Sequence, residues 1–260
     1  MKPLHTEAHF EADITAHLAA NGWLLDDAAN DHARYDRSRA LFPEDVLGWL
    51  QDTQPEEYIK AISNGQDALL DRLCAVLDKE GPLTVLRRGF KFVGGSGAGT
   101  ASLDMCQFRP AFGINPATMT RYSAVRCRVV PQVRYSLHNE NSIDLVLFVN
   151  GIPIVTLELK TGFTQDVHAA IRQYKRDRLP KNAGTRAVEP LLEPNRRALV
   201  HFAVSSEEVY MTTVLAGQYT RFLPFNTGND DGWATHPTRR DAAPRTCGKK
   251  CCNATTGLIF

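Results

Sequence analysis

Apolar residues recur at helical spacing in the first third of the chain. Phe10, Ile14 and Leu18 lie four residues apart, which predicts an amphipathic helix that begins near residue 6. The same spacing predicts a second helix after Pro43 (EDVLGWLQ) and a third over DALLDRLCAVLDKEG, which ends at Gly81.

Further along the chain the pattern changes to short apolar runs, which favour strands. Strands are predicted at 124–136, 198–206 and 208–214, and two more in the stretch SIDLVLFVNGIPIVTLELK at 142–160. Asn150-Gly151 between two apolar runs is a strong hairpin signal. A helix is predicted over DVHAAIRQYKRDR. Residues 215–260 lack a regular spacing of apolar residues and are interpreted as a tail. Helices followed by strands with a helix between them predict a mixed α/β or α+β domain.

Composition and charge narrow the functional classes. The chain has 260 residues, 43% apolar and 23% charged, with a net charge of +1. This is enough for one domain of ordinary size or two small ones, and it does not mark the whole chain as a nucleic-acid binder. A local basic surface has three candidate runs, each of which is more simply a solvated face. These runs are Arg87–Arg88–Lys91, Arg126–Arg128–Arg134 and Lys175–Arg176–Arg178–Lys181.

Several common assignments are excluded or disfavoured. No apolar run reaches the roughly 20 residues that span a bilayer, and MKPLHTEAHFEADI has no secretory apolar region, so we expect a soluble cytoplasmic protein. The glycine-rich segment at 94–99 lacks the Gly-Lys-Ser/Thr of a nucleotide-binding loop and is interpreted as a flexible turn. Cys74, Cys106 and Cys127 are scattered singly, which suits buried reduced thiols.

The 142–160 hairpin carries charged residues that need an explanation. In its second strand Ile154, Thr156, Glu158 and Lys160 are expected on one face, because side chains alternate with a period of two. Glu-x-Lys is usually an ordinary exposed pair. Here the flanking residues are apolar, and Asp144 lies in the first strand, where a carboxylate is costly unless it is paired or bound to a metal. Oxygen ligands of this kind suit Mg²⁺.

The register of the hairpin decides whether the two carboxylates meet. A two-residue Asn150-Gly151 turn places Asp144 opposite Leu157, on the other face from Glu158. A three-residue turn places Asp144 opposite Glu158. A shared metal therefore predicts a three-residue loop with a bulge at Gly151, or an equivalent bulge elsewhere in the first strand.

At these residues the sequence resembles the PD-(D/E)xK nucleases. The stretches HNENSIDLVLFVNGIPIVTLELK, AIRQYKRDR, LVHFAVSSEEVYMTT and LAGQYTRFLPFNTGND resemble, more specifically, the N-terminal nuclease domain of the R subunit of type I restriction–modification enzymes. The resemblance runs from about residue 6 to about residue 231. It implies a restriction-endonuclease-like mixed sheet flanked by helices, with a nuclease domain over residues 1–231.

The resemblance also implies an activity and a set of roles. The activity is Mg²⁺-dependent cleavage of double-stranded DNA, that of a type I site-specific deoxyribonuclease. Asp144 and Glu158 would be metal ligands, and Lys160 the catalytic lysine. Methylation and specificity subunits would be the partners and would choose the DNA site. ATP use would belong to a motor region, which these residues lack.

The helix after the motif departs from the pattern of the family. The family has Gln-x-x-x-Tyr there, whereas Gln173 is followed at once by Tyr174. Gln173, Tyr174, Arg172 and Lys175 are therefore candidates for DNA binding or for positioning of the site. Glu11 is a candidate outer acidic residue, although a solvated helix glutamate is the simpler interpretation.

The last residues read differently from the rest. After FLPFNTGNDDG the sequence turns to ATHPTRRDAAPRTCGKKCCNATTGLIF, and a shifted reading frame from Trp233 permits GNPPNPPGCRTAYLWEEVLQRDDWFDL, which resembles the continuation of the family. We expect residues 232–260 to be a frameshifted, disordered tail of a chain truncated before its motor. On this interpretation Cys247, Cys251 and Cys252 form no zinc site, because they lack the usual ligand spacing.

Two other functions remain open from the sequence. One alternative is a catalytically silent DNA-binding or assembly remnant of a truncated R subunit. The presence of Asp144, Glu158 and Lys160 favours a functional site over this alternative. A two-carboxylate hydrolase of small molecules is the weaker alternative, since such a pair needs neither Lys160 nor the basic helix.

Overall fold

The computed structural model describes five stretches of the chain, which are residues 6–26, 34–95, 97–113, 115–161 and 166–225. The expected tail at 232–260, its three cysteines and the frameshift lie outside the described residues. No helix within the described residues has the length and apolar character needed to cross a membrane.

Seven α-helices lie within the described stretches, and four of them confirm the helices predicted from the sequence. They are α1 (Glu7–Ala20), α3 (Pro43–Thr53), α4 (Pro55–Ala61), α5 (Gln66–Glu80), α6 (Pro82–Arg88), α7 (Pro116–Ser123) and α8 (Val167–Arg176), with a 3-10 turn at Ile62–Asn64. Local signals fix where they begin and end. The side chain of Thr6 caps α1 by accepting from the N–H of His9. Gly81, at a φ of 80°, ends α5 and opens α6.

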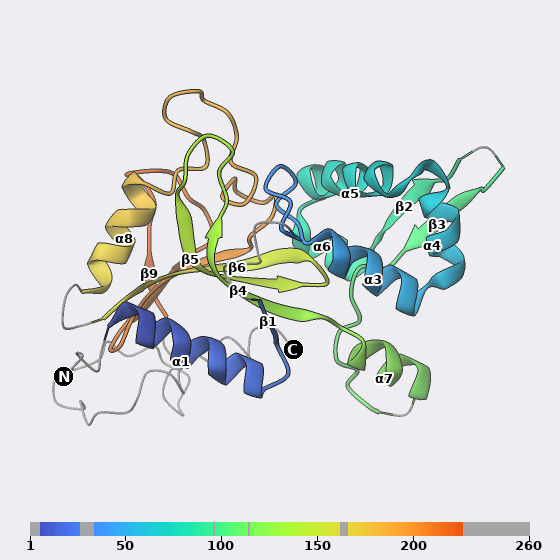
Figure 1. Ribbon diagram of the computed structural model, residues 1–260, viewed down its shortest axis with the longest axis horizontal. Helices are drawn as coiled ribbons and strands as arrows, with labels where there is room; N and C mark the ends of the chain where they lie inside the picture. Colours follow the sequence, from blue (N-terminus) through green and yellow to red (C-terminus); the bar gives the residue numbers. More distant parts are fainter. Residues whose placement is uncertain (1–5, 27–33, 96, 114, 162–165, 226–260) are drawn as a thin grey trace.

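The strands form a seven-stranded mixed sheet and a separate two-stranded sheet, shown in Figure 1. Their bounds are β1 (Leu24–Leu25), β2 (Phe90–Val93), β3 (Thr100–Leu103), β4 (Cys127–Arg134), β5 (Ser142–Val149), β6 (Ile152–Lys160), β7 (Val200–Ser205), β8 (Val209–Thr212) and β9 (Leu223–Pro224). The order in the large sheet is β1-β4-β5-β6-β7-β8-β9, with β1–β4 and β6–β7 parallel and the other pairs antiparallel. The expected mixed α/β fold is confirmed.

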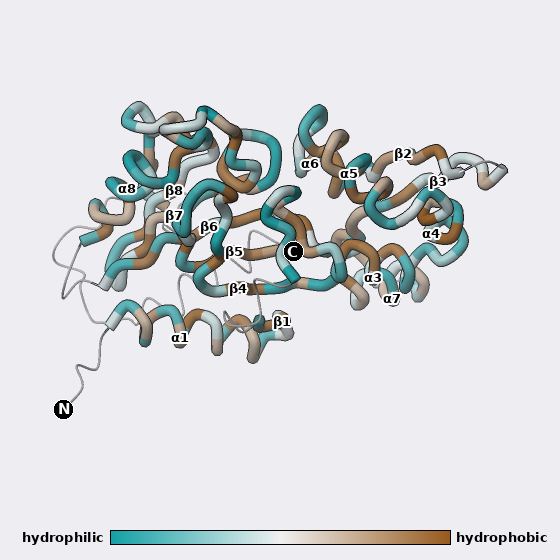
Figure 2. Tube along the Cα trace, turned by 45° about the horizontal axis from the view of Figure 1, so that its top comes forward, coloured by the Kyte–Doolittle hydropathy of each residue, from teal (hydrophilic) through white to brown (hydrophobic). Residues whose placement is uncertain are grey.

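Strand β6 lies in the middle of the large sheet, and all nine of its residues are buried. Helix α1 contacts β4 and β6, and helix α8 contacts β6 and β7. Figure 2 shows hydrophobic segments running through the centre of this sheet, with more hydrophilic colour on α1 and α8. A charged side chain on β6 is therefore enclosed by the fold rather than left on a solvated edge.

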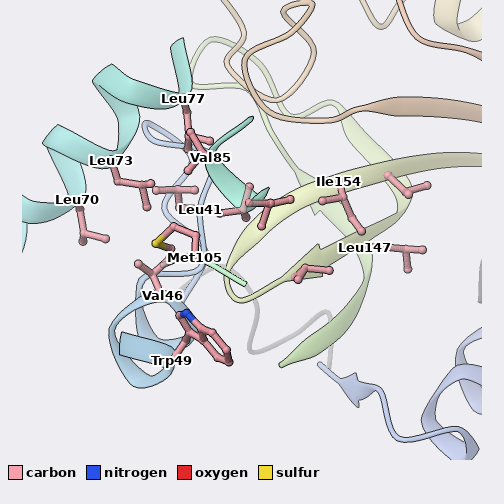
Figure 3. Close-up of a cluster of buried hydrophobic side chains, with 14 of the residues drawn as sticks. Leu41, Val46, Trp49, Leu70, Leu73, Leu77, Val85, Met105, Leu147 and Ile154 are labelled. Carbon is pink, nitrogen blue, oxygen red and sulfur yellow. The ribbon is translucent and has the colours of Figure 1, made fainter. Parts of the chain in front are cut away.

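A second lobe, built from α3 to α6 with β2 and β3, shares its core with the large sheet. Leu73 and Leu77 of α5 belong to the same buried cluster as Leu147 of β5 and Ile154 of β6 (Figure 3). Trp49 of α3 is fully buried in this cluster, and its indole N–H donates to the carbonyl of Asp104 at 2.7 Å. This continuous core attaches the lobe to the strands of the hairpin.

The fold corrects one sequence prediction and confirms another. Residues 215–225 belong to the fold and not to a tail, because Leu215 is 2% exposed and β9 pairs with β8. The described glycines of the 94–99 segment connect β2 to β3, which confirms a turn there. Cys74, Cys106 and Cys127 are free and half-buried, and burial raises the pKa of the Cys106 thiol to about 12.

Arg128, in one of the basic runs, is neither a solvated residue nor available to DNA. It is 6% exposed, and its guanidinium lies 5.0 Å from the centre of the Phe42 ring. Its nitrogens donate to both carboxylate oxygens of Asp45, at 2.6 and 2.9 Å, and to Asp26 at 2.9 Å and Glu44 at 3.0 Å. This residue therefore stabilises the junction between β4 and α3.

Candidate active site

The hairpin turn between β5 and β6 is shorter than predicted. Val149 pairs with Ile152, so the turn has two residues, Asn150 at a φ of 47° and Gly151 at a φ of 80°. These positive φ values fit a type I′ turn. A Cβ on Gly151 would lie 2.4 Å from the carbonyl oxygen of Phe42, so only glycine fits there.

The register still changes by one residue, at a bulge within the hairpin. Leu147 pairs with Val155 and Phe148 pairs with Pro153, which leaves Ile154 as the extra residue in β6. The bulge is therefore in the second strand, and the predicted three-residue loop or first-strand bulge is wrong. The bulge also moves Ile154 into the cluster of Leu147 and Val155, so the expectation that it shares a face with Glu158 is wrong too.

The register beyond the bulge agrees with the one that the metal hypothesis requires. Leu145 pairs with Leu157, and one further step along both strands matches Asp144 with Glu158. The backbone pairing ends at Leu145, and the Oδ2 atom of Asp144 accepts the N–H of Leu159 at 2.7 Å. Half-buried Asp144 thus takes a position where the two strands stop pairing, and it is held there by the backbone of β6.

Glu158 is the most enclosed of the charged groups. It is fully buried, and its Oε1 atom accepts from the Nε atom of Arg178 at 2.7 Å. Its Oε2 atom is buried and has no hydrogen-bond partner. Burial, followed by the charge of Asp144, raises the pKa of Glu158 to about 8, although Arg178 and Lys160 oppose the shift. A buried carboxylate oxygen without a partner is costly, and a bound cation would satisfy it.

Lys160 lies two residues further along β6 and is 8% exposed. Its Nζ atom pairs with the Oε2 atom of Glu7, in the first turn of α1, at 3.4 Å. The sequence did not point to Glu7, because the residue lies more than 150 positions away in the chain. Helix α1 therefore brings an acidic residue to the lysine of the hairpin.

Glu11 lies one helical turn beyond Glu7 and reaches the same region. The amide of Gln132 donates to its Oε2 atom at 2.6 Å, and the hydroxyl of Ser142 donates to Gln132 at 3.1 Å. The pKa of Glu11 is raised, first by burial and in smaller part by the charge of Asp144. The structure thus places half-buried Glu11 near Asp144, and its role as an outer acidic residue stays a prediction.

A buried hydrogen-bonded chain supports β6 from the side of α8. The Oγ1 atom of Thr156 lies 2.8 Å from the hydroxyl of Tyr174 and 2.7 Å from the Nδ1 atom of His201. Burial lowers the pKa of His201 to about 3, so its ring is neutral at ordinary pH. Tyr174 is fully buried, and its place fits a positioning role rather than DNA contact.

The other candidates on α8 face outward. Arg172 is exposed, Gln173 and Lys175 are half-buried, and a surface depression of about 390 Å³ is lined by Arg172, Gln173 and Arg176 among others. Arg178, just beyond the helix, does the opposite: it is 7% exposed and pairs with Glu158. As part of a basic run it was a candidate for a DNA-binding surface, and its burial excludes a direct contact with DNA in this conformation.

The donors at the centre fit a hard divalent cation. Among the described residues, no group of three or more His, Cys, Asp or Glu side chains is arranged to hold a metal ion. Mg²⁺ needs less than that, since it is usually held by one or two carboxylates and completes its shell with water. Half-buried Asp144 and the free Oε2 atom of Glu158 supply such a set.

One comparison with known proteins finds a match. Residues 118–220 match the family model described as Type I restriction enzyme R protein N terminus. The matched segment includes β5, β6 and α8, with Asp144, Glu158, Lys160 and Arg178, and it excludes α1 with Glu7 and Glu11. No curated protein matches the chain.

Proposed function

Because residues 118–220 belong to the type I restriction enzyme R protein N-terminal family, we propose that the chain is a Mg²⁺-dependent endonuclease for double-stranded DNA. The observation that carries the proposal is the unpartnered Oε2 atom of Glu158, which is buried beside Asp144 in the register that a shared ion requires. The substrate would be foreign DNA in a restriction system.

The reaction would be hydrolysis of a phosphodiester bond. A water oxygen bonds to phosphorus while one P–O ester bond breaks, and the products are a phosphate monoester and an alcohol. A divalent cation supplies Lewis-acid polarisation of the phosphate and offsets charge in the transition state. Asp144 and Glu158 would hold that cation through Oδ and Oε2 atoms.

Lys160 would contribute a cation on the same side as the two carboxylates. Its Nζ atom carries three donors, and it is held by Glu7 at 3.4 Å, a long contact that a substrate could replace. In that position it would orient the attacking water and stabilise negative charge on the phosphate oxygens. Glu7 would hold the ammonium group in place before DNA arrives.

The outer face of α8 would supply affinity without sequence preference. Arg172, Lys175 and Arg176 are exposed or half-buried on this helix, which contacts β6 and β7. Contacts from such residues to phosphates position a duplex but read no bases. Site choice would therefore rest on the methylation and specificity subunits, with which we propose the chain assembles.

Cleavage of supercoiled plasmid DNA by the purified chain tests the proposal. We expect nicking that requires Mg²⁺ or Mn²⁺ and falls by at least ~100-fold in Asp144→Asn, Glu158→Gln and Lys160→Met, because each change removes a ligand or a transition-state contact. Glu189→Gln is the matched control, since Glu189 is also a buried carboxylate and accepts from Ser136 at 2.7 Å, outside the centre.

Two results would count against the proposal. Nicking that persists in all three variants would assign the activity to a contaminant or to another site. A folded parent chain that does not nick DNA with either cation would favour the alternative of a silent DNA-binding or assembly remnant.

A further inference from the structure

We infer that Arg178 occupies one oxygen of Glu158 and thereby restricts the centre to a single divalent cation. The inference rests on the proposed function and deepens it, because it assigns a positioning role to a residue outside the Asp144, Glu158 and Lys160 set. The observation behind it is that the two oxygens of one fully buried carboxylate differ. Oε1 accepts from the Nε atom of Arg178 at 2.7 Å, and Oε2 has no partner.

The first step concerns what a second ion would need. Two-metal hydrolytic sites hold their ions roughly 3.5–4 Å apart. A carboxylate that bridges such a pair uses one oxygen for each ion. In this chain the Nε–H group of Arg178 already uses Oε1, so Glu158 offers Oε2 alone.

The charge of Arg178 also opposes a second ion. The guanidinium of Arg178 carries its positive charge at the oxygen where a second cation would have to bind. Like charges repel strongly in a poorly hydrated site, and Arg178 is 7% exposed beside fully buried Glu158. Arg178 also remains protonated under all ordinary conditions, so its charge persists when a first ion binds.

Contacts around the end of α8 hold Arg178 in place. It follows α8 directly, and its backbone N–H bonds to the carbonyl of Gln173 at 3.1 Å. The helix end is fastened on two sides: Tyr174 bonds to Thr156 of β6 at 2.8 Å, and the hydroxyl of Tyr135 donates to the carbonyl of Asp177 at 3.3 Å. The guanidinium is therefore held against β6 by the fold.

Mn²⁺ binding tests the inference without relying on cleavage. The number of bound ions is counted from the loss of the free-ion signal in electron paramagnetic resonance, and spin–spin coupling in frozen samples reports two ions close together. We expect one Mn²⁺ per wild-type chain with no coupling. In Arg178→Met the count should rise twofold, with a coupled spectrum, because Oε1 is freed and the positive charge is gone.

Two further variants separate positioning from folding. Arg178→Lys retains a cationic donor and should restore a count of one. Arg197→Met removes another buried arginine, which pairs with Asp78 at 2.7 Å and not with Glu158. This variant should leave the ion count and the spectrum unchanged. If Arg178→Met does not fold, Arg178→Gln takes its place, and its count should also rise because the positive charge is gone.

The outcomes distinguish the inference from the proposed function. Two coupled ions in the wild-type chain, or an unchanged count in folded Arg178→Met, overturns the role of Arg178 and leaves the nuclease proposal intact. A wild-type chain that binds no Mn²⁺ and does not cut DNA overturns both.

Discussion

Two buried arginines of this chain, Arg128 and Arg178, each pair with carboxylates, but the two clusters are completed to different degrees. Arg128 donates to both oxygens of Asp45 and also to Asp26. Neither carboxylate has a buried oxygen without a partner. Arg178 donates to Glu158 and leaves the second oxygen of that carboxylate unpaired.

The contrast between the two clusters separates a buried charge that stabilises the fold from one that marks a candidate site. Burial of an arginine and a carboxylate is common to both clusters, so burial alone does not mark a site. In the Arg128 cluster the hydrogen bonds offset desolvation, and the cluster needs nothing further. At Glu158 the protein leaves a desolvated oxygen beside Asp144, and the pKa of Glu158 rises to about 8 as a result. The proposed cation would pair with that oxygen and offset the charge that raises this pKa.

The largest expected effect is on the completed cluster. Arg128→Met should lower the free energy of unfolding by ~3–5 kcal/mol, because buried Asp26 and Asp45 lose their shared partner and are left with Arg34 and Arg126. Urea denaturation measures the change. Asp78→Asn, which weakens an ion pair that is 37% exposed on the carboxylate side, is the milder comparison. A loss below ~1 kcal/mol for Arg128→Met would show that the cluster does not stabilise the fold as described.

The second effect concerns the incomplete cluster. Saturating Mg²⁺ or Mn²⁺ should stabilise the wild-type chain by ~2.7 kcal/mol when the ion is at 100 times its dissociation constant. Thermal denaturation with and without the ion measures this shift. Glu158→Gln should abolish the shift, whereas Arg197→Met should retain it. Equal stabilisation of wild type and Glu158→Gln would place the ion elsewhere.

The third effect is a pH dependence without metal. The folded-state pKa of Glu158, about 8, lies above its ordinary value of 4.5, so the folded chain retains a proton that the unfolded chain has lost. Stability is therefore highest below about pH 4.5 on account of this group, and falls as the pH rises to about 8. Between pH 6 and pH 8 the loss should be ~2 kcal/mol.

Glu158→Gln sharpens this test, because glutamine resembles the protonated acid. Near pH 4.5 the variant should match the wild type, at pH 6 it should already be the more stable of the two by ~2 kcal/mol, and at pH 8 the difference should grow by a further ~2 kcal/mol. Urea titrations in a chelating buffer measure both. Parallel pH profiles for the two proteins would contradict the raised pKa of Glu158 and, with it, the contrast between the clusters.

The smallest expected effect concerns the exposed arginines. Arg172→Ala should weaken DNA binding a few-fold and reduce its salt dependence, because Arg172 is exposed on α8 and contacts phosphates at most. Fluorescence anisotropy with a duplex at several salt concentrations measures this. Stability should change by less than ~0.5 kcal/mol, as for other exposed positions. An unchanged salt slope would remove Arg172 from the binding surface.

The sequence revealed the hairpin because its signals are local. Asn150-Gly151 has the backbone freedom that a two-residue turn needs, and the apolar runs on both sides predict buried strands. The register was predicted from chemistry, since Asp144 and Glu158 can share an ion only if a residue is added. Where that residue lies was not predicted, because the bulge at Ile154 is accommodated by packing against Leu147 and by the bond from the N–H of Leu199.

The partners of the hairpin residues were not predictable in the same way. Arg178 stands in a run of basic residues that is indistinguishable from a solvated face, and only the position of α8 turns it toward Glu158. Glu7, in the first turn of α1 near the start of the chain, pairs with Lys160 at the end of β6. Such pairs depend on tertiary packing, and the separation of the two residues along the chain gives no sign of it. The sequence could not show either that Arg128 pairs with the buried carboxylate of Asp45 instead of facing solvent.

The most direct test of the account is a crystal structure of the chain with Mn²⁺, read by the anomalous signal of the metal. We expect one peak at bonding distance from an oxygen of Asp144 and from the Oε2 atom of Glu158, with Arg178 still bonded to Oε1. Well-ordered crystals in which Mn²⁺ binds elsewhere, while the Oε2 atom of Glu158 remains unpaired, would contradict the claim that this oxygen marks a metal site.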